Sequence, residues 1–279
     1  MTLVQVILIV AFAPYLQGAM KRLRARLQGR PGPSPWQPYR DLRKLWSKDA
    51  VLPVGANWIV ACTPGVVFGV ALTFAAAVPL VASPPAFLDV VALMLLLALG
   101  RWLVAVSALD ARSSFTGMAA SREMTLSALT EPALLLALLG ARVSGGSFLI
   151  PHGNISVAGV IALLAFGIVT IGETARIPVD NQETHYELTM IHEGQTLEYS
   201  GWHLALLNLA SYIRQLAFLT IAAGLILPNP IAAVAGAAVL AVAITFVENA
   251  FARLRLFEIP QLLLTGMLLA AVSVAVRAV

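Results

Sequence analysis

Residues 86–108 read AFLDVVALMLLLALGRWLVAVSA and carry only two charged side chains, Asp89 and Arg101. A helix rises about 1.5 Å per residue, so a stretch of this length crosses the ~30 Å hydrocarbon core of a bilayer. Backbone polar groups in lipid must be satisfied within the segment, which favours a helix. The alternating ten-residue strands of a membrane barrel are not seen here. The stretch therefore predicts a transmembrane helix.

The same pattern recurs along the whole chain, which is 59 % hydrophobic and 11 % charged over 279 residues. So much apolar surface does not fit inside one soluble core. We predict an all-α, polytopic integral membrane protein, a single membrane domain over 1–279, with about eight transmembrane helices. The predicted spans are 2–20, 53–82, 86–108, 124–142, 155–172, 202–226, 231–250 and 258–278. The second is long and contains Pro53, Pro64 and Pro79, so we expect it to be tilted or kinked.

The basic residues predict the orientation of these spans. Cytoplasmic loops usually carry more Lys and Arg than loops on the opposite side of the membrane. The predicted loops of one side, about 21–52, 109–123, 173–201 and 251–257, hold 14 of the 18 Lys and Arg residues. The opposite side holds only Arg142 and Arg277. We therefore expect a cell inner (cytoplasmic) membrane protein with both termini on the outer, periplasmic side, and a first span kept as an anchor. The excess of basic over acidic residues in the chain is then a property of the cytoplasmic loops and does not indicate nucleic-acid binding.

The first of these loops divides into two parts. GRPGPSPWQPY has four prolines between Pro31 and Pro38, which favours an extended, stiff segment. YRDLRKLWSK, residues 39–48, places Tyr39, Leu42 and Trp46 at helical spacing opposite basic residues. This pattern is typical of a short interfacial amphipathic helix. A plain solvated loop is the alternative.

Several charged residues fall inside or at the ends of the spans, where they cost about 2.5–3.5 kcal/mol each and usually serve function. Arg101 and Arg214 are intramembrane counter-charges. Glu123 and Glu131 are eight residues apart, about 12 Å along one helix, on neighbouring parts of one face. We expect these carboxylates to line a hydrated cavity near the cytoplasmic side together with two others, Glu248 and Glu258. The functional interpretation is a proton relay; the alternative is that nearby arginines neutralise them in packing salt bridges.

Residues 172–201, GETARIPVDNQETHYELTMIHEGQTLEYSG, hold six of the chain's 14 acidic residues and a single base, Arg176. The acids are Glu173, Asp180, Glu183, Glu187, Glu193 and Glu198. His185 and His192 lie seven residues apart and lack the spacing of a zinc-binding helix. Cys62 is the only cysteine, so no internal disulfide or cysteine-ligated cluster forms. We expect no metal site and no catalytic centre in this chain.

Four stretches carry a resemblance to a known family. ETARIPVDN (173–181) followed by LEYSG (197–201) resembles the large cytoplasmic loop in the subunit 1 family of respiratory complex I. That family usually reads closer to ETNRAPFDL. GPSPWQPYRDLRKLWSKD (32–49), SREMTLSALTEPALL (121–135) and the long acidic stretch are more similar to a sister branch, the membrane subunit of formate hydrogenlyase and hydrogenase-4 type complexes. FVENAFARLRLFEIPQLL (246–263) resembles that branch too.

The resemblance implies an eight-span, non-catalytic subunit that anchors the peripheral redox arm of a membrane-bound [NiFe] hydrogenase and couples it to proton translocation. Its implied partners are the hydrogenase large and small subunits, an iron–sulfur subunit and antiporter-like membrane subunits. The [NiFe] centre and the iron–sulfur clusters then lie in partner subunits, and this chain binds no cofactor. The resemblance implies relay roles for the carboxylates and loop-shaping or docking roles for other loop residues, which are Arg176, Asp180, Glu183 and Tyr199.

Three other functions stay open. The chain could be the same subunit in a quinone-reducing enzyme, a free-standing ion transporter, or a purely structural anchor whose carboxylates only dock partners. The resemblance also leaves open whether electrons come from formate, carbon monoxide or ferredoxin, and whether H⁺ or Na⁺ is moved.

Overall fold

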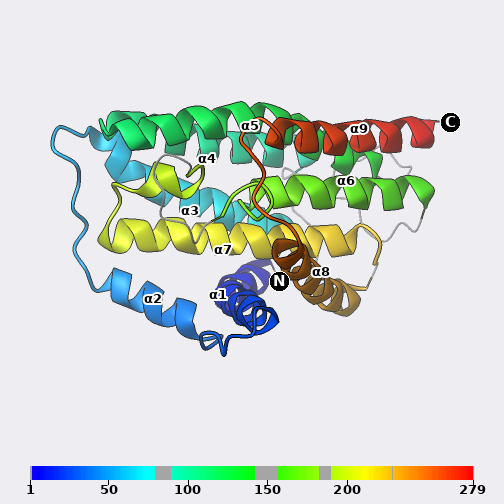
Figure 1. The fold of residues 1–279 in the computed structure, drawn as a ribbon, viewed down its shortest axis with the longest axis horizontal. Helices are drawn as coiled ribbons and strands as arrows, with labels where there is room; N and C mark the ends of the chain where they lie inside the picture. The colour runs from blue at the N-terminus through cyan, green and yellow to red at the C-terminus, as the bar shows by residue number, and fades with distance from the viewer. Residues whose placement is uncertain (1, 79–88, 142–155, 182–189, 228, 279) are drawn as a thin grey trace.

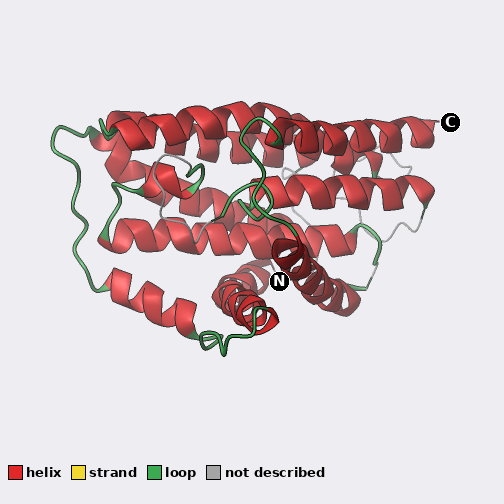
Figure 2. Ribbon diagram, in the orientation of Figure 1, coloured by secondary structure: helices red, strands yellow, loops and turns green. Residues whose placement is uncertain are grey.

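The computed structural model describes residues 2–78, 89–141, 156–181, 190–227 and 229–278. Every element of regular structure in these ranges is a helix (Figure 2). The helices are α1 Thr2–Leu27, α2 Gln37–Trp46, α3 Trp58–Ala77, α4 Val90–Asp110, α5 Ser114–Gly140, α6 Val157–Glu173, the 3-10 turn η1 Glu193–Thr196, α7 Gly201–Gly224, α8 Pro230–Ala250 and α9 Ile259–Ala278. The all-α prediction is confirmed. Five residues named above lie outside the described ranges: Pro79, Arg142, Glu183, His185 and Glu187.

Seven of these helices are long and apolar enough to cross a membrane, and α6, with 17 residues, is a shorter apolar helix. Together they match the eight predicted spans one to one, so the polytopic membrane architecture is confirmed. The predicted interfacial helix is α2. The backbone is already helical at Trp36, the residue before α2. Pro38 lies in the first two positions of the helix, where a backbone N–H would have no partner within the helix.

Three predicted boundaries were wrong. α1 continues to Leu27, past the predicted end of its span, because hydropathy marks the lipid-facing length while helical hydrogen bonding runs on into the basic residues. α3 is shorter than the predicted 53–82 stretch and starts only at Trp58. The predicted loop 109–123 shrinks to 111–113, because α5 begins at Ser114 with a polar first half. Glu123 therefore lies well inside a helix and not at its start.

The helices form one elongated bundle (Figure 1). α4, α5, α6, α7 and α9 run along the long axis, whereas α1 and α8 are steeply inclined to it. α2 lies at the edge of the bundle, against α1 and α7. Aromatic side chains from three helices meet in the core. The ring centroid of Phe218 in α7 lies 4.9 Å from that of Phe74 and 6.0 Å from that of Phe166. Small residues allow the closest approaches, as at Gly140 of α5, which packs directly on Ser273 of α9.

The chain between α6 and α7 folds back into the bundle. α6 ends about halfway along the long axis, and the loop after it lies near the middle of the view in Figure 1, beside the loop that joins α8 to α9. The backbone N–H of Leu254 donates to the carbonyl of Pro178 at 2.9 Å, so the two loops are joined. Most described residues of 174–200 are buried, including Arg176, Asp180 and Tyr199. This arrangement places charged loop residues inside the bundle.

Candidate functional site

Arg101 of α4 is the centre of a buried ion cluster. Its Nη1 lies 2.9 Å from Oε1 of Glu131 and its Nε lies 3.7 Å from Oε1 of Glu123, both on α5. Its Nη2 donates to Oε2 of Glu173, the last residue of α6. Two helices thus bring three carboxylates onto the one guanidinium that α4 carries. The side chain of Glu173 is 1 % exposed and that of Glu131 is 34 % exposed, so the cluster runs from the interior to the bundle surface.

His192 extends the cluster towards α7. Its Nδ1 lies 3.6 Å from Oε1 of Glu123, and its Nε2 lies 3.4 Å from Nη2 of Arg214. The backbone N–H of His192 donates to Oδ2 of Asp180 at 3.1 Å, and Oδ1 of the same carboxylate pairs with Arg253 at 3.0 Å. Asp180 therefore fastens the loop after α6 both to the segment before η1 and to the loop after α8.

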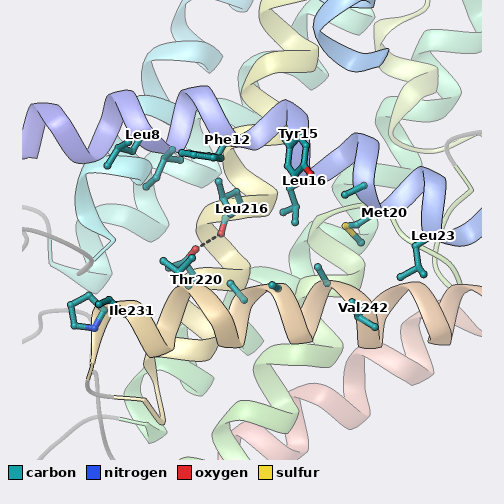
Figure 3. A pocket seen from close by; sticks show the side chains of 17 residues that line it. Leu8, Phe12, Tyr15, Leu16, Met20, Leu23, Leu216, Thr220, Ile231 and Val242 are labelled. Atoms are coloured by element: carbon teal, nitrogen blue, oxygen red, sulfur yellow. Dashed lines mark hydrogen bonds between the residues drawn. The ribbon is translucent and has the colours of Figure 1, made fainter. Parts of the chain in front are cut away.

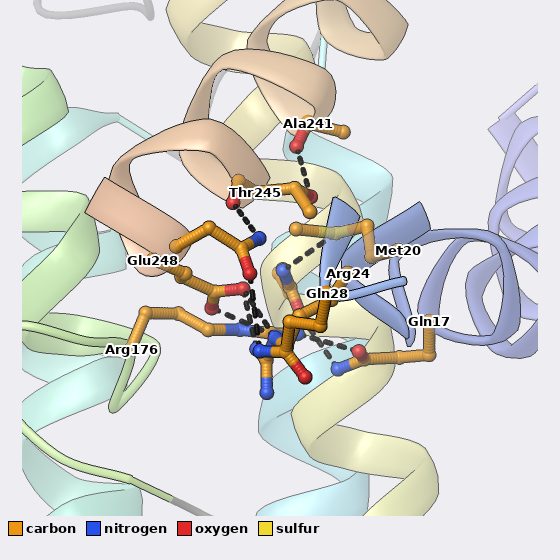
Figure 4. Close-up of polar contacts among 10 residues, drawn as sticks. Gln17, Met20, Arg24, Gln28, Arg176, Ala241, Thr245 and Glu248 are labelled. Atoms are coloured by element: carbon orange, nitrogen blue, oxygen red, sulfur yellow. Dashed lines mark hydrogen bonds and ion pairs between the residues drawn. The ribbon is translucent and has the colours of Figure 1, made fainter. Parts of the chain in front are cut away.

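A second buried cluster surrounds Glu248 at the end of α8 (Figure 4). Its Oε1 pairs with Nη1 of Arg176 at 3.2 Å, and its Oε2 accepts hydrogen bonds from Nε of Arg24 at 3.1 Å and from Nη2 of Arg24. The Glu248 side chain is fully buried and Arg176 is 3 % exposed. Two guanidiniums thus share one carboxylate, the reverse of the arrangement at Arg101.

Two glutamines stand between the clusters. Nη2 of Arg176 donates to Oε1 of Gln215 at 2.6 Å and to Oε1 of Gln17, and Nε2 of Gln17 donates to Oε1 of Gln215 at 2.5 Å. Gln17 also lines a cavity of about 100 Å³ together with Arg101, Glu123 and His192. At the roughly 10–15 Å³ that one water needs by this measure, the space has room for several waters. The cavity connects the Arg101 cluster with the glutamines and, through them, with Arg176 and Glu248.

A smaller void adjoins Glu173. It measures about 10 Å³ and is lined by Glu123, Glu173, Asp180 and His192. That size is close to the smallest that holds one water, roughly 10–15 Å³. Oε1 of Glu173 is buried and has no hydrogen-bond partner among the described residues. Glu173 thus presents a free carboxylate oxygen in a polar void between the other carboxylates.

The structure brings together four of the predicted relay acids. Glu123, Glu131 and Glu173 share Arg101, and Glu248 belongs to the neighbouring cluster. Glu193 lines the cavity at the start of η1. The expectation that the first two carboxylates share one face of a helix agrees with their common contact on Arg101.

Two other predicted relay acids lie elsewhere. Glu258 is exposed, and its Oε2 accepts the backbone N–H of Arg255 at 3.1 Å, so it caps the turn before α9 and lies outside the two cavities that Glu123 lines. Its place in the predicted cavity was therefore wrong. Glu198 is half-buried beside Tyr199, whose phenol has a pKa raised by burial. Arg214 pairs with His192 as an intramembrane cation, and the loop residues Arg176 and Asp180 are internal ion-pair partners.

Sequence reasoning missed Gln17, Arg24 and Gln215, and it assigned His192 no part in the cluster. Arg24 was counted as an ordinary loop charge because it follows the apolar run. Gln17 and Arg24 are seven residues apart, which puts them on one face of α1 two turns from each other. A polar residue within an apolar span, aligned with an arginine, was the available signal.

Within the described ranges, no group of three or more His, Cys, Asp and Glu residues is arranged to hold a metal ion. The site is therefore a network of charges and amides around a small cavity. Carboxylates held this close to one another are chemically able to bind protons and exchange them.

The sequence matches the family described as NADH dehydrogenase over residues 1–278. The chain belongs to this family. It is 36 % identical over 290 residues to formate hydrogenlyase subunit 4 of Escherichia coli (strain K12), with 95 % of this chain and 94 % of the relative covered. It is 35 % identical over 237 residues to hydrogenase-4 component C of the same organism, covering 81 % of this chain and 74 % of the relative. The resemblance seen in the motifs is confirmed.

A more distant relative and a solved structure extend the comparison. NADH-ubiquinone oxidoreductase chain 1 of Salmo salar is 28 % identical over 243 residues, with 81 % of this chain and 72 % of the relative covered. A chain of the membrane-bound sulfane sulfur reductase, an archaeal respiratory membrane complex, has a TM-score of 0.80 at 19 % identity and covers 99 % of both chains. The fold is thus shared with a subunit of a respiratory membrane complex.

Proposed function

We propose that this chain is the non-catalytic membrane-anchor and coupling subunit of a complex I-like, membrane-bound hydrogenase of the formate hydrogenlyase type. Its similarity to formate hydrogenlyase subunit 4 along nearly the full length of both chains supports this assignment. The subunit docks the peripheral redox arm and links it to proton translocation through its buried carboxylates. It binds no cofactor itself, and the [NiFe] centre and iron–sulfur clusters belong to partner subunits.

The arrangement of three carboxylates around the single guanidinium of Arg101 carries the proposal. All three carboxylates contact one guanidinium, and His192 joins Glu123 to Arg214, so the charges of this group are coupled. A charge change at one member alters the proton occupancy of the others. Glu173 and Glu131 lie at the buried and the half-exposed end of this group. The cluster is therefore suited to pass a proton from the interior to a neighbouring subunit.

The cavity size supports a relay. At about 100 Å³ it falls below the ~300–1,000 Å³ of pockets that hold small organic ligands, yet it accommodates several waters. Waters in this space join Glu123 and His192 to Gln17. A proton can then move without any side chain leaving the bundle.

The partners in this proposal are the [NiFe] hydrogenase large and small subunits, an iron–sulfur subunit and antiporter-like membrane subunits. The redox arm sits on the side that carries α2, η1 and the basic end of α1. This side faces the cytoplasm, because its loops carry most of the Lys and Arg residues. Both termini then lie on the outer side of the inner membrane.

The test is to replace the two end members of the cluster separately, as Glu131→Gln and Glu173→Gln, in the complex in its native membrane. Inside-out vesicles are assayed for hydrogen evolution and for proton uptake. A relay predicts that proton uptake falls at least ten-fold while the complex stays assembled. Glu258→Gln is the matched control, because this carboxylate is exposed and lies outside both clusters. Unchanged proton uptake in both variants, or loss of assembly alone, would leave only a structural anchor.

A second candidate is the same subunit in a quinone-reducing enzyme. The 28 % identity to NADH-ubiquinone oxidoreductase chain 1 of Salmo salar favours it, since that relative's name includes a quinone. Purified complex that produces no hydrogen and reduces a soluble quinone analogue would support this second function. Hydrogen evolution that is insensitive to quinone-site inhibitors would exclude it.

A further inference from the structure

A second cavity lies on the other side of the Glu248 cluster from the Arg101 cavity, between α1 and α8 with α7 as its floor (Figure 3). It is an open groove of about 590 Å³. The two helices run side by side in the same direction, and apolar side chains such as Phe12, Leu16 and Val242 point into the space between them. On the floor, the hydroxyl of Thr220 donates to the carbonyl of Leu216 at 2.7 Å, so this polar group is satisfied within α7. The groove therefore offers an occupant apolar contact along its whole length.

The groove has the proportions of extended hydrocarbon chains. On α1 it runs from Leu8 to Leu23, 15 residues or about 22 Å. Spread over that length, 590 Å³ leaves a mean cross-section of about 27 Å². A helix with side chains is ~10–12 Å in diameter and needs roughly 80–110 Å². The enclosed part of the groove is therefore narrower than a helix with its side chains, and a partner helix would lie only partly within it.

One end of the groove is closed by polar contacts. Glu248 holds Arg24 there, and Nε2 of Gln28 donates to Oδ1 of Asn249 at 3.1 Å (Figure 4). These bonds tie the last turn of α1 to the last turn of α8. An apolar chain lying in the groove therefore ends against a polar boundary.

Positive charge lies at that closed end. Arg26 is three residues beyond Leu23 and so continues the groove-facing side of α1. It is exposed. Arg22, one turn earlier, stands at the edge of the same face, and its Nε is buried without a hydrogen-bond partner among the described residues. The groove thus joins an apolar channel to two guanidiniums at one end.

We propose that this groove binds one anionic phospholipid, with its acyl chains between α1 and α8 and its headgroup phosphate on Arg22 and Arg26. Apolar length, narrow cross-section and terminal positive charge together match an amphiphile with hydrocarbon tails and a negative head. The bound lipid fills the gap between the two inclined helices beside the Glu248 cluster. This inference is independent of the proposed hydrogenase role.

The experiment uses the purified complex containing the full chain, stripped of lipid by detergent exchange. It is titrated with phosphatidylglycerol and with phosphatidylcholine of identical acyl chains, and native mass spectrometry counts the lipids retained. We expect one phosphatidylglycerol per chain, bound at least five-fold more tightly than phosphatidylcholine. Two variants fill the groove, Ala19→Phe and Ala238→Phe, from positions that are half-exposed and exposed. Each should weaken retention of both lipids at least ten-fold.

Matched controls separate the groove from general effects. Ala235→Phe adds the same bulk at an exposed position of α8 that does not line the groove, and should keep the lipid. Arg26→Gln should remove most of the preference for phosphatidylglycerol, while Arg255→Gln, at an exposed loop position, should leave it intact. Equal binding of the two lipids to the unaltered chain would overturn the proposal. So would retention by both groove-filled variants, or recovery of a quinone or a polypeptide in place of the lipid.

Discussion

The guanidinium of Arg176 lies 3.2 Å from the carboxylate of Glu248, although 72 positions separate the two residues in the sequence. The contact joins the loop after α6 to the last turn of α8, and Arg24 completes it from α1. The family motif that contains Arg176 is thus tied into the interior by its charge. The motif thus contacts a buried acid of α8 directly.

Replacing Glu248 tests the energetic role of this cluster. Glu248→Gln leaves two guanidiniums, those of Arg24 and Arg176, buried without their shared anion. Removing one partner of a buried ion pair costs about 3–5 kcal/mol, so we expect the free energy of unfolding in detergent to fall by that amount. Thermal unfolding of the purified protein measures it. Glu258→Gln, at an exposed carboxylate, should change stability by less than about 0.5 kcal/mol. Equal effects of the two substitutions would contradict the assignment.

Replacing Arg101 tests the other cluster, where one cation is shared by several carboxylates. Arg101→Gln leaves three carboxylates without their common cation and should destabilise the protein by about 3–5 kcal/mol. Arg101→Lys should restore only part of this, because an ammonium is a point charge and cannot spread across three partners. The double variant Arg101→Gln with Glu131→Gln should be more stable than Arg101→Gln alone, since one uncompensated charge is removed. Additive losses in this double-mutant cycle would mean that the two side chains do not interact.

Hydropathy predicted the fold because the backbone of each span has to form its hydrogen bonds within the span, whatever its neighbours do. The eight apolar stretches therefore became eight helices. The predicted helix boundaries were wrong where a helix continues beyond its apolar stretch. α1 continues past Arg24, and α5 starts nine residues before Glu123. Hydropathy reports the solvent around a helix, and hydrogen bonding decides where the helix ends.

The candidate site could be predicted only in part. Glu123, Glu131 and Arg101 were visible as charges inside apolar spans, and Glu173 through its family motif. The pairing of Arg24 with Glu248, 224 positions apart, depends on how α1 and α8 cross, which no local pattern encodes. Glu258 looked equivalent to Glu248 in sequence, yet it is exposed in the turn before α9, where its carboxylate accepts the backbone N–H of Arg255.

Close helix packing gives a prediction about stability. A Cβ added at Gly140 would lie 1.9 Å from Oγ of Ser273, so Gly140→Ala must push α5 and α9 apart. We expect a loss of about 1–3 kcal/mol, the usual cost of overpacking. Gly167→Ala in α6 is the control, since nothing lies within 4 Å of its added Cβ, and it should gain up to ~1 kcal/mol from helix propensity. Adding Ser273→Gly should recover part of the Gly140→Ala loss. Chemical unfolding in mixed micelles measures the free energy of unfolding of the unaltered chain, the two single variants and the double variant.

The final prediction concerns Gly201, the last residue of the motif LEYSG. Gly201 has a φ of +54° and begins α7, and an added Cβ would lie 2.4 Å from the carbonyl oxygen of Asp49. Beside it, the hydroxyl of Ser200 accepts the backbone N–H of Val51 at 2.8 Å, so the segment after α2 is fastened to the start of α7. Gly201→Ala therefore meets both backbone strain and a clash.

Gly29→Ala separates these two effects, because Gly29 has a φ of +74° but nothing within 4 Å of its added Cβ. Strain alone predicts a loss of about 1–2 kcal/mol for Gly29→Ala. Gly201→Ala should cost about 1–3 kcal/mol more and should make residues 47–57 sensitive to limited proteolysis, since the joint to α7 opens. Equal losses in the two variants, with no new cleavage between α2 and α3, would show that the approach of Asp49 does not require glycine in this motif.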